Sequence, residues 1–592
     1  MCRLLFSFNS SQHSDIEKDN FARALLTMKA GGPDSTGIKN IYPHLLMGLN
    51  RLSLKDRRNI ADQPYSSLSG NSTIIYNGEI YNHDELRSYL PEHKWKTSSD
   101  TETIVELIEL YSPEFILPKI RGMYAFVYYD KRKNKILISR DNSGIKPLFI
   151  TSLKKNNNHI LCISSEIKAI LDFLNKRNFS ISDIARDEYF NFGYVRQPKT
   201  IFNEIKAVPT NCYLEFDISK GFMARHNLNQ ENFNLAGDLE EILSESLELR
   251  LQKDLEIPYF LSGGIDSTLL VAIAKRKLGL DPITISATFN KTDYDESKFI
   301  ANTINKLNIK NTHTINIIPN NFIYETIDNI AELTDQPFAD SSFIVTKYLC
   351  NVAKNLNFKG YIGADGADEC FWGYLKYKNF CKYLKLRKLF YLPFFREINK
   401  KINYEANHPM DELDVIISSN EHPFNRNKKS YSSISKKINP SSLLEYDRST
   451  YLQSDILVKC DLAGMSESIE NREVYLDQNI IKWSNKYYEN YSFNSAPESK
   501  LPLKKLLFKY FPDYQTPKKK MGFATPLPNW SIYDSTINNI VSKELNEKSL
   551  LQIFEKVPSY ISSYQNLNLD QRKKYHSKIW LYFCWSKFVK SF

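Results

Sequence analysis

Leu261-Ser-Gly-Gly-Ile-Asp-Ser-Thr268 joins an apolar run at residues 257–261 to a helical pattern at residues 267–278. A second apolar run follows at residues 282–289. The order strand, helix, strand is typical of a crossover connection, so it predicts a parallel sheet with the glycine turn at the end of its first strand. We therefore expect an α/β domain in the second half of the chain.

The glycine turn has the composition of a phosphate-binding loop. Gly263 and Gly264 would let the backbone approach an anion closely, and the amides that open the next helix favour negative charge. Ser262 and Ser267 add hydroxyl donors, whereas Asp266 suits the loop only if it holds Mg²⁺ beside the phosphates. The spacing matches neither GxxxxGK(S/T) nor GxGxxG, so we expect neither a standard P-loop nor a dinucleotide fold. A glycine turn capped by Asp and Ser, without a ligand, is the alternative.

A second acidic segment, Gly363-Ala-Asp-Gly-Ala-Asp-Glu-Cys-Phe-Trp-Gly-Tyr374, follows the apolar pair Tyr361-Ile362. Its three carboxylates, Asp365 and the adjacent pair Asp368-Glu369 with glycine and alanine between them, would stand at the carboxyl end of a strand. That position suits a metal ligand together with a base. An EF-hand is the competing interpretation, but the segment lacks the spacing and the terminal Glu of that loop.

The first half of the chain has a different pattern. Short β-rich runs between residues 4 and 218 alternate with helical stretches such as residues 100–111. They predict an α+β domain with layered, mainly antiparallel sheets. Residues 227–235 are polar and weakly patterned, so we expect a linker there and domains at residues 2–220 and 236–592. From residue 443 onward the pattern becomes mostly helical.

The composition excludes several classes of protein. With 592 residues, 42% of them hydrophobic, the chain is long enough for two or more soluble domains. It has neither a membrane-length apolar run nor a signal peptide, so we expect a cytoplasmic protein without a membrane partner. Its eight cysteines form no CxxC pair, which argues against zinc and disulfide scaffolds. The net charge of +10 is scattered along the chain, and we expect no nucleic-acid partner.

Cys2 directly follows the initiator methionine. Removal of Met1, which the small Cys2 side chain permits, would leave a thiol and a free α-amine on one residue. That pairs a strong nucleophile with a base whose pKa lies near neutrality. A cysteine at this position also arises by chance, so the rest of the chain must support a catalytic role.

Nearly the whole chain resembles the glutamine-hydrolysing asparagine synthetase family, in which an N-terminal nucleophile glutaminase domain precedes an ATP-pyrophosphatase domain. The matching segments of the first half are Met1-Cys2, Gly32-Pro-Asp34, Arg51-Leu-Ser53, Tyr76-Asn-Gly-Glu-Ile-Tyr-Asn82, Ser99-Asp100, Arg140-Asp141, Gly144-Ile-Lys-Pro-Leu148 and Ser165-Glu-Ile-Lys-Ala169. Those of the second half are the Ser262 loop, Tyr294-Asp-Glu-Ser297, Gln336-Pro-Phe-Ala-Asp-Ser-Ser342, the Asp365 segment, Leu457-Val-Lys-Cys-Asp461, Leu476-Asp477 and Lys520-Met-Gly-Phe523.

The resemblance implies a glutaminase in the first half. Cys2 would attack the glutamine side-chain amide while its own amine carries the proton, and Asn77 and Gly78 would hold the oxyanion. Glutamine binding would also use Arg51 on the α-carboxylate, with Glu79 and Asp100 on the α-ammonium. The alternative is that residues 76–80 form only a hairpin with an Asn-Gly turn.

The resemblance implies an ATP site in the second half. The residues expected to bind ATP are Leu261, Ser262, Gly263, Gly264, Asp266, Ser267, Ser286, Gly363 and Ala364. Asp266 and Asp368 would hold Mg²⁺, Asp365 would assist the attack of ammonia, and Lys520 would neutralise phosphate.

The implied reaction converts aspartate to asparagine through β-aspartyl-AMP, with release of AMP and pyrophosphate. Ammonia from glutamine would travel through a dry passage between the domains, because in water it would be protonated and lost. The family also implies a homodimer. A regulatory protein that keeps only the fold is the alternative of a different class, and it predicts the loss of motif residues that are present here.

Several residues depart from the family pattern. They are Ala30 and Gly31 in place of His-Arg, Leu462 in place of Arg, Glu467 in place of a small or apolar residue, Asn471 in place of an apolar residue, and Glu473-Val-Tyr475 in place of Val-Pro-Phe. These departures fall partly in the half that binds the acceptor. Another carboxylate, such as a uronic acid of a surface polysaccharide, therefore remains an alternative to aspartate.

Overall fold

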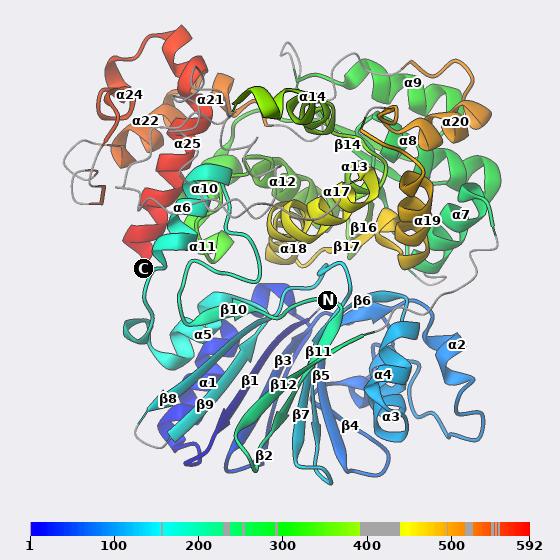
Figure 1. Ribbon diagram of the computed structural model, residues 1–592, viewed down its shortest axis with the longest axis vertical. Coiled ribbons are helices and arrows are strands. Elements are labelled where there is room, and N and C mark those ends of the chain that lie inside the picture. Colours follow the sequence, from blue (N-terminus) through cyan, green and yellow to red (C-terminus); the bar gives the residue numbers. More distant parts are fainter. Residues whose placement is uncertain are drawn as a thin grey trace.

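The computed structural model describes residues 2–155, 158–228, 237–251, 255–289, 294–390, 439–493, 495–515, 525–545, 550, 553–554 and 557–592. Within these residues, antiparallel sheets form the first part of the chain, and a parallel sheet surrounded by helices forms the second (Figure 1). The predictions of an α+β domain followed by an α/β domain with a helical C-terminal part are confirmed.

Two antiparallel sheets pack face to face in the first domain. One has the order β10-β8-β9-β1-β3-β2 and the other β12-β11-β7-β6-β5-β4. Their bounds are β1 (Arg3–Asn9), β2 (Ser35–Tyr42), β3 (Leu45–Arg51), β4 (Tyr65–Ser66), β5 (Ser72–Ile80), β6 (Gly122–Asp130), β7 (Lys135–Arg140), β8 (Phe149–Lys155), β9 (Asn158–Ser164), β10 (Ile205–Ala207), β11 (Cys212–Asp217) and β12 (Phe222–Asn227). Because side chains alternate along a strand, Cys2, Leu4 and Phe6 all point into the core between the sheets.

Helices cover the outer faces of both sheets and give four layers. Helices α1 (Asp15–Leu26) and α5 (Ile167–Leu174) pack on the sheet that contains β1, and α3 (Asp100–Leu110) packs on β5 of the other sheet. The predicted helix at residues 100–111 is therefore present. Short helices α2 (His83–Arg87) and α4 (Pro113–Ile116) flank α3, and α6 (Asp183–Phe192) extends toward the second domain (Figure 1).

The second domain is built on a parallel sheet of order β15-β14-β13-β16-β17. Its strands are β13 (Tyr259–Phe260), β14 (Thr284–Thr288), β15 (Thr312–Asn316), β16 (Gly360–Gly363) and β17 (Glu470–Glu473). The chain builds outward from β13 through β14 to β15 on one side, and then adds β16 and β17 on the other side. The order thus reverses between β13 and β16, which is where open α/β sheets bind their ligands.

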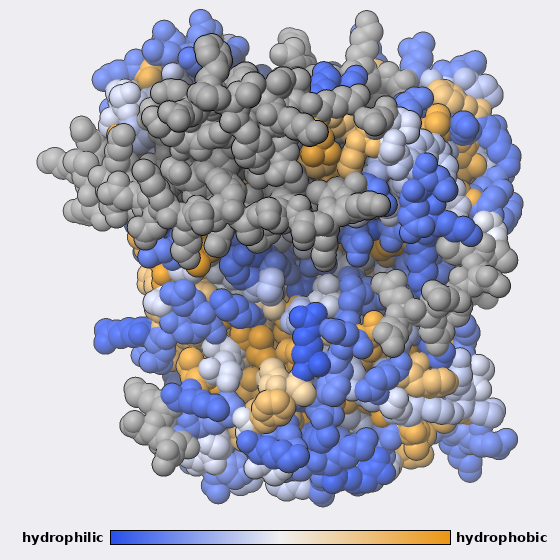
Figure 2. All heavy atoms as spheres, viewed as in Figure 1, coloured by the Kyte–Doolittle hydropathy of each residue, from blue (hydrophilic) through white to orange (hydrophobic). Residues whose placement is uncertain are grey.

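Helices surround this sheet and fill the C-terminal part. They are α7 (Leu239–Arg250), α8 (Ile265–Ala272), α9 (Ser297–Leu307), α10 (Asn321–Asp328), α11 (Ile330–Thr334), α12 (Ser342–Asn355), α13 (Ala367–Cys370), α14 (Leu375–Phe390), α17 (Pro440–Asp447), α18 (Leu457–Ser466), α19 (Gln478–Glu489), α20 (Leu501–Tyr510), α21 (Leu527–Tyr533), α22 (Ser535–Glu544), α24 (Ser559–Ser562) and α25 (Leu569–Ser591). Among the described residues, no helix is both long and apolar enough to cross a bilayer. On the face shown in Figure 2, hydrophobic residues of the first domain lie in small patches among hydrophilic ones.

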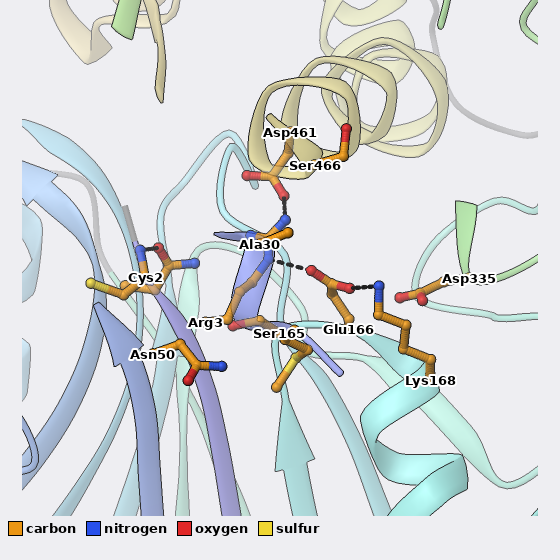
Figure 3. Close-up of polar contacts among 12 residues, drawn as sticks. Cys2, Arg3, Ala30, Asn50, Ser165, Glu166, Lys168, Asp335, Asp461 and Ser466 are labelled. Atoms are coloured by element: carbon orange, nitrogen blue, oxygen red, sulfur yellow. Dashed lines mark hydrogen bonds and ion pairs between the residues drawn. The ribbon is translucent and has the colours of Figure 1, made fainter. Parts of the chain in front are cut away.

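The two domains meet through buried ion pairs around Arg3 (Figure 3). The fully buried guanidinium contacts Glu166 of its own domain, and its Nη2 lies 2.8 Å from Oδ2 of Asp461 on α18. Lys146 reaches the same carboxylate at 3.2 Å. Gly31 leaves room for this arrangement, because a Cβ there would lie 2.7 Å from Cγ of Arg3. The strand that begins beside Cys2 is therefore fastened to a helix of the second domain.

Replacement of Arg3 by methionine (R3M) would leave Asp461 and Glu166 buried with one cation fewer. Removal of one partner of a buried ion pair costs about 3 kcal/mol, and we expect the free energy of unfolding to fall by about that amount. Guanidinium-induced unfolding, followed by tryptophan fluorescence, measures the change. The matched control K18M breaks an exposed pair with Asp15 and should unfold like the wild type. A loss in R3M no larger than in K18M would contradict this account of the interface.

Candidate functional site

A small cavity of about 30 Å³ opens beside the Cys2 thiol. Its walls come from the start of the N-terminal strand, the end of β3 with the loop after it, the second half of β5 and the start of α3, together with Glu470 of β17 in the second domain. The sequence-predicted residues among its lining are Cys2, Arg51, Gly78, Glu79 and Asp100. Residues from both domains are thus gathered around one thiol.

Asn77 and Gly78 lie inside strand β5 and pair with β6, so they form no hairpin turn. The backbone N–H of Cys2 donates a hydrogen bond of 3.0 Å to Oδ1 of Asn77. The buried Nδ2 of the same amide has no hydrogen-bond partner among the described residues. A Cβ on Gly78 would lie 2.2 Å from the carbonyl oxygen of Met123, so only glycine fits there. The arrangement leaves an amide donor next to the nucleophile.

Charges of both signs surround the cavity. Nζ of Lys55 lies 2.9 Å from Glu79, and Arg472 of the second domain approaches the other carboxylate oxygen at 3.6 Å. Burial opposes ionisation of Glu79, but these two cations outweigh it and lower the pKa of the carboxyl. Asp100 accepts hydrogen bonds from the Tyr76 hydroxyl and the Ile80 amide, at 2.8 and 2.9 Å. Glu79 is therefore held by two cations, and Asp100 is oriented by the two hydrogen bonds that it accepts.

Arg51 and Cys2 are both buried at the edge of this cavity. Arg51 donates to Asp62 at 2.7 Å and to the Asp56 carbonyl at 2.7 Å, which orients its guanidinium. Burial raises the pKa of the Cys2 thiol, and the charge of Arg51 partly offsets that rise. The thiol therefore depends on a nearby base to become a thiolate. Sequence reasoning missed Lys55 and the approach of Arg472, because no local motif signals either contact.

The predicted phosphate loop lies at the point where the strand order reverses. Gly263 has φ = +77°, and a Cβ there would meet Phe299 and Ile300 within 2.9 Å. The Ser267 hydroxyl lies 3.1 Å from that of Ser262, and helix α8 begins directly after Gly264. Of the predicted nucleoside residues, Leu261 follows β13, Gly363 ends β16 and Ala364 follows it. Ser286 lies inside β14, next to the register pair Phe260 and Ile285 and therefore level with Leu261. Except for Ser286, these residues thus lie along the carboxyl edge of one sheet.

Asp266 and Asp368 are brought together across this edge. Oδ2 of Asp266 and Oδ1 of Asp368 each lie 2.6 Å from Nζ of Lys500. Two carboxylates that share one cation form a donor set that also fits a hard divalent ion such as Mg²⁺. Sequence reasoning missed Lys500, because Ser499-Lys500-Leu501 resembles no phosphate or metal motif.

Asp365 follows β16 and faces helix α18 and strand β17. Its carboxylate accepts a hydrogen bond of 3.2 Å from the Cys460 thiol and lies 3.9 Å from Nζ of Lys459. Its backbone amide donates to Glu473 at 2.9 Å. Lys520, the remaining predicted catalytic residue, lies outside the described residues.

Comparisons with known proteins cover both halves of the chain. The family model described as a glutamine amidotransferase domain matches residues 1–226, and the asparagine synthase model matches residues 238–582. Asparagine synthetase (glutamine-hydrolysing) 1 of Bacillus subtilis is 26% identical over 579 residues, which cover 88% of each chain. Asparagine synthetase (glutamine-hydrolysing) 2 of the same organism is 30% identical over 371 residues, 58% of this chain and 48% of the relative. Because the asparagine synthase model alone covers more than half of the chain and the amidotransferase model covers most of the part before it, the chain belongs to the glutamine-hydrolysing asparagine synthetase family.

Proposed function

We propose that the chain hydrolyses glutamine and uses MgATP to convert aspartate to asparagine through β-aspartyl-AMP. The observation that carries the proposal is the buried Cys2, whose amide is held by Oδ1 of Asn77 while Nδ2 of the same side chain stays available. The proposal assigns glutaminase to residues 2–220 and synthetase to residues 236–592. It includes a cytoplasmic location and a homodimer, which the resemblance implies.

In the first step, Cys2 Sγ attacks the amide carbon of glutamine. The α-amine exposed by removal of Met1 takes the thiol proton and passes it to the leaving ammonia. Water then attacks the resulting thioester, the C–S bond breaks, and glutamate leaves with the Cys2 thiol restored. Nδ2 of Asn77 and the Gly78 amide donate to the oxyanion. Arg51 holds the α-carboxylate of glutamine, and Glu79 and Asp100 hold its α-ammonium.

In the second step, the acceptor carboxylate attacks the α-phosphate of ATP. The amides and hydroxyls of Ser262, Gly263, Gly264 and Ser267 hold the departing pyrophosphate, whose negative charge the start of α8 favours. Mg²⁺, bound by Asp266 and Asp368, would neutralise phosphate charge. Leu261, Ser286, Gly363 and Ala364 border the nucleoside. Asp365 assists the attack of ammonia on the acyl-AMP. Lys520, like Mg²⁺, neutralises phosphate charge.

A larger acceptor is the second candidate, because a cavity of about 300 Å³ lies close to the Asp365 segment. Its lining includes Tyr374, Tyr446, Tyr451, Arg196 and Lys376. The Tyr374 hydroxyl donates to Glu369, the residue after Asp368, at 2.6 Å. Aromatic rings and cations suit a ring-bearing carboxylic acid such as a uronic acid.

Replacement of Cys2 by alanine (C2A) should abolish glutamine-dependent amide formation, because the nucleophile is lost. Amide formation from added ammonium should persist at the wild-type rate, since the second site is intact. Glutamate, amide and pyrophosphate are measured in parallel. C162A, a buried cysteine of neighbouring strand β9, is the control and should keep both activities. Equal loss of both activities in a folded C2A protein would contradict the division of labour.

Aspartate should support pyrophosphate release about tenfold or more above glucuronate in the presence of glutamine and ATP, with asparagine as product. Mass spectrometry of the amide identifies the acceptor. The variant K376M should leave the KM for aspartate unchanged, because the 300 Å³ cavity is not needed for so small a substrate. Pyrophosphate release with glucuronate but not with aspartate would favour the second candidate, and so would a raised KM for glucuronate in K376M.

A further inference from the structure

Glu473 stands at the carboxyl end of β17, directly beside the residues proposed to carry the acyl-adenylate. It is 1% exposed, and its Oε2 accepts a hydrogen bond of 2.9 Å from the Asp365 amide. Nδ2 of Asn471 donates to Oε1 at 3.3 Å. A Cβ on Gly363 would lie 2.4 Å from both carboxylate oxygens, so the carboxylate rests against the backbone of β16.

A carboxyl group and a thiol lie close to the Glu473 carboxyl. Side-chain ligand atoms of Asp365, Cys460 and Glu473 all lie within 4.8 Å of one another. Nζ of Lys459 lies 3.9 Å from Oδ1 of Asp365, and its charge also acts on Glu473. Ionisation of the buried Glu473 next to the partly exposed Asp365 carboxylate is costly, so the pair favours a proton on one of the two groups.

Glu467 and Glu473 both depart from the family pattern, but their surroundings differ. Glu467 is paired with Lys347 and accepts a hydrogen bond of 3.1 Å from Asn351, so a neighbouring cation stabilises it. Glu473 replaces an apolar family residue and faces another acid instead. A buried group held in such an environment is a candidate for proton transfer.

We propose that Glu473 is a catalytic residue of the amide-forming step, where it accepts the proton that the attacking ammonia loses. This inference rests on the proposed function of the second site. Asp365 and Glu473 then act as a pair: Asp365 supplies a fixed negative charge beside the incoming nitrogen, and Glu473 receives the proton.

The proton count of the step requires such an acceptor. Neutral ammonia forms a C–N bond to the carbonyl carbon of the acyl-AMP, and its nitrogen becomes positively charged. The C–O bond to AMP breaks, and AMP leaves with that electron pair. One N–H proton passes to the Glu473 carboxylate, which gives a neutral amide and a protonated Glu473 that later returns its proton to water.

The groups around Glu473 also predict a pH dependence. Burial, followed by the negative charge of Asp365, raises the pKa of Glu473 to about 8, while the Asn471 hydrogen bond and the Lys459 charge oppose this rise. Cys460 on α18 and Tyr361 on β16 also face it. Because the carboxylate is the accepting form, its population rises with pH through about 8. The efficiency of amide formation should rise with it.

The test compares E473Q with the wild type. Glutamine is the nitrogen donor, and the acceptor is aspartate or glucuronate, whichever supports pyrophosphate release in the wild type. The readout is the amount of amide formed per glutamate released, between pH 6.5 and 9. In the wild type this ratio should rise through pH 8. In E473Q it should fall by about tenfold or more and lose the rise, because a glutamine amide cannot accept the proton.

Two partial reactions serve as internal controls. Glutamate release reports the first site, and ATP–pyrophosphate exchange without glutamine reports adenylation; E473Q should keep both. E467Q, which alters the paired glutamate of the same segment, should keep the wild-type pH profile. E473D, which retains a carboxylate, should keep the rise with pH at a lower ratio and remains informative if E473Q does not fold.

A wild-type ratio and pH profile in E473Q would overturn the proposal, as would a flat profile in E473D. Failure of the proposed function looks different. In that case the wild type itself shows no ATP–pyrophosphate exchange with aspartate or glucuronate, whatever residue 473 is.

Discussion

The ion pair between Arg3 and Asp461 fixes the distance between the two halves of the reaction. Arg3 is the first residue of β1 and directly follows Cys2, and Asp461 belongs to α18. The two residues before Asp461, Lys459 and Cys460, contact Asp365. A single helical turn thus connects the N-terminal strand to the proposed site of amide formation. A buried charge pair holds its partners in one geometry, because either partner alone would be strongly destabilised.

Strand β17 makes a second connection of the same kind. The guanidinium of Arg472 lies close to the Glu79 carboxylate in the Cys2 cavity. The next residue, Glu473, accepts a hydrogen bond from the backbone amide of Asp365. Because successive side chains of a strand point to opposite faces, one dipeptide serves both sites. Together with α18, it keeps the nucleophile and the acyl-adenylate site in a fixed relation, which suits an intermediate that must avoid bulk water.

Local patterns in the sequence were sufficient for the fold and for much of the candidate site. The glycine turn at residues 262–264 and the segment at residues 76–82 are motifs that can be recognised from a few consecutive residues. The phosphate loop and the residues around Cys2 could therefore be predicted. Lys500 could not be, because it meets Asp266 only through a contact across 234 positions. Lys55 was missed for a related reason: its role depends on where Glu79 lies in space. The sequence also could not distinguish the roles of Glu467 and Glu473, since only the folded chain shows that Glu467 forms an ion pair with Lys347.

Gly31 and Arg3 have a consequence for how this chain could have diverged from its relatives. The family often carries an arginine at the position of Gly31, yet any side chain there would collide with the stem of Arg3. In this structure a side chain at residue 31 and the stem of Arg3 cannot occupy the same space, so the buried Arg3 requires glycine at residue 31. The two positions should therefore vary together among close homologues, as an example of epistasis between residues 28 positions apart.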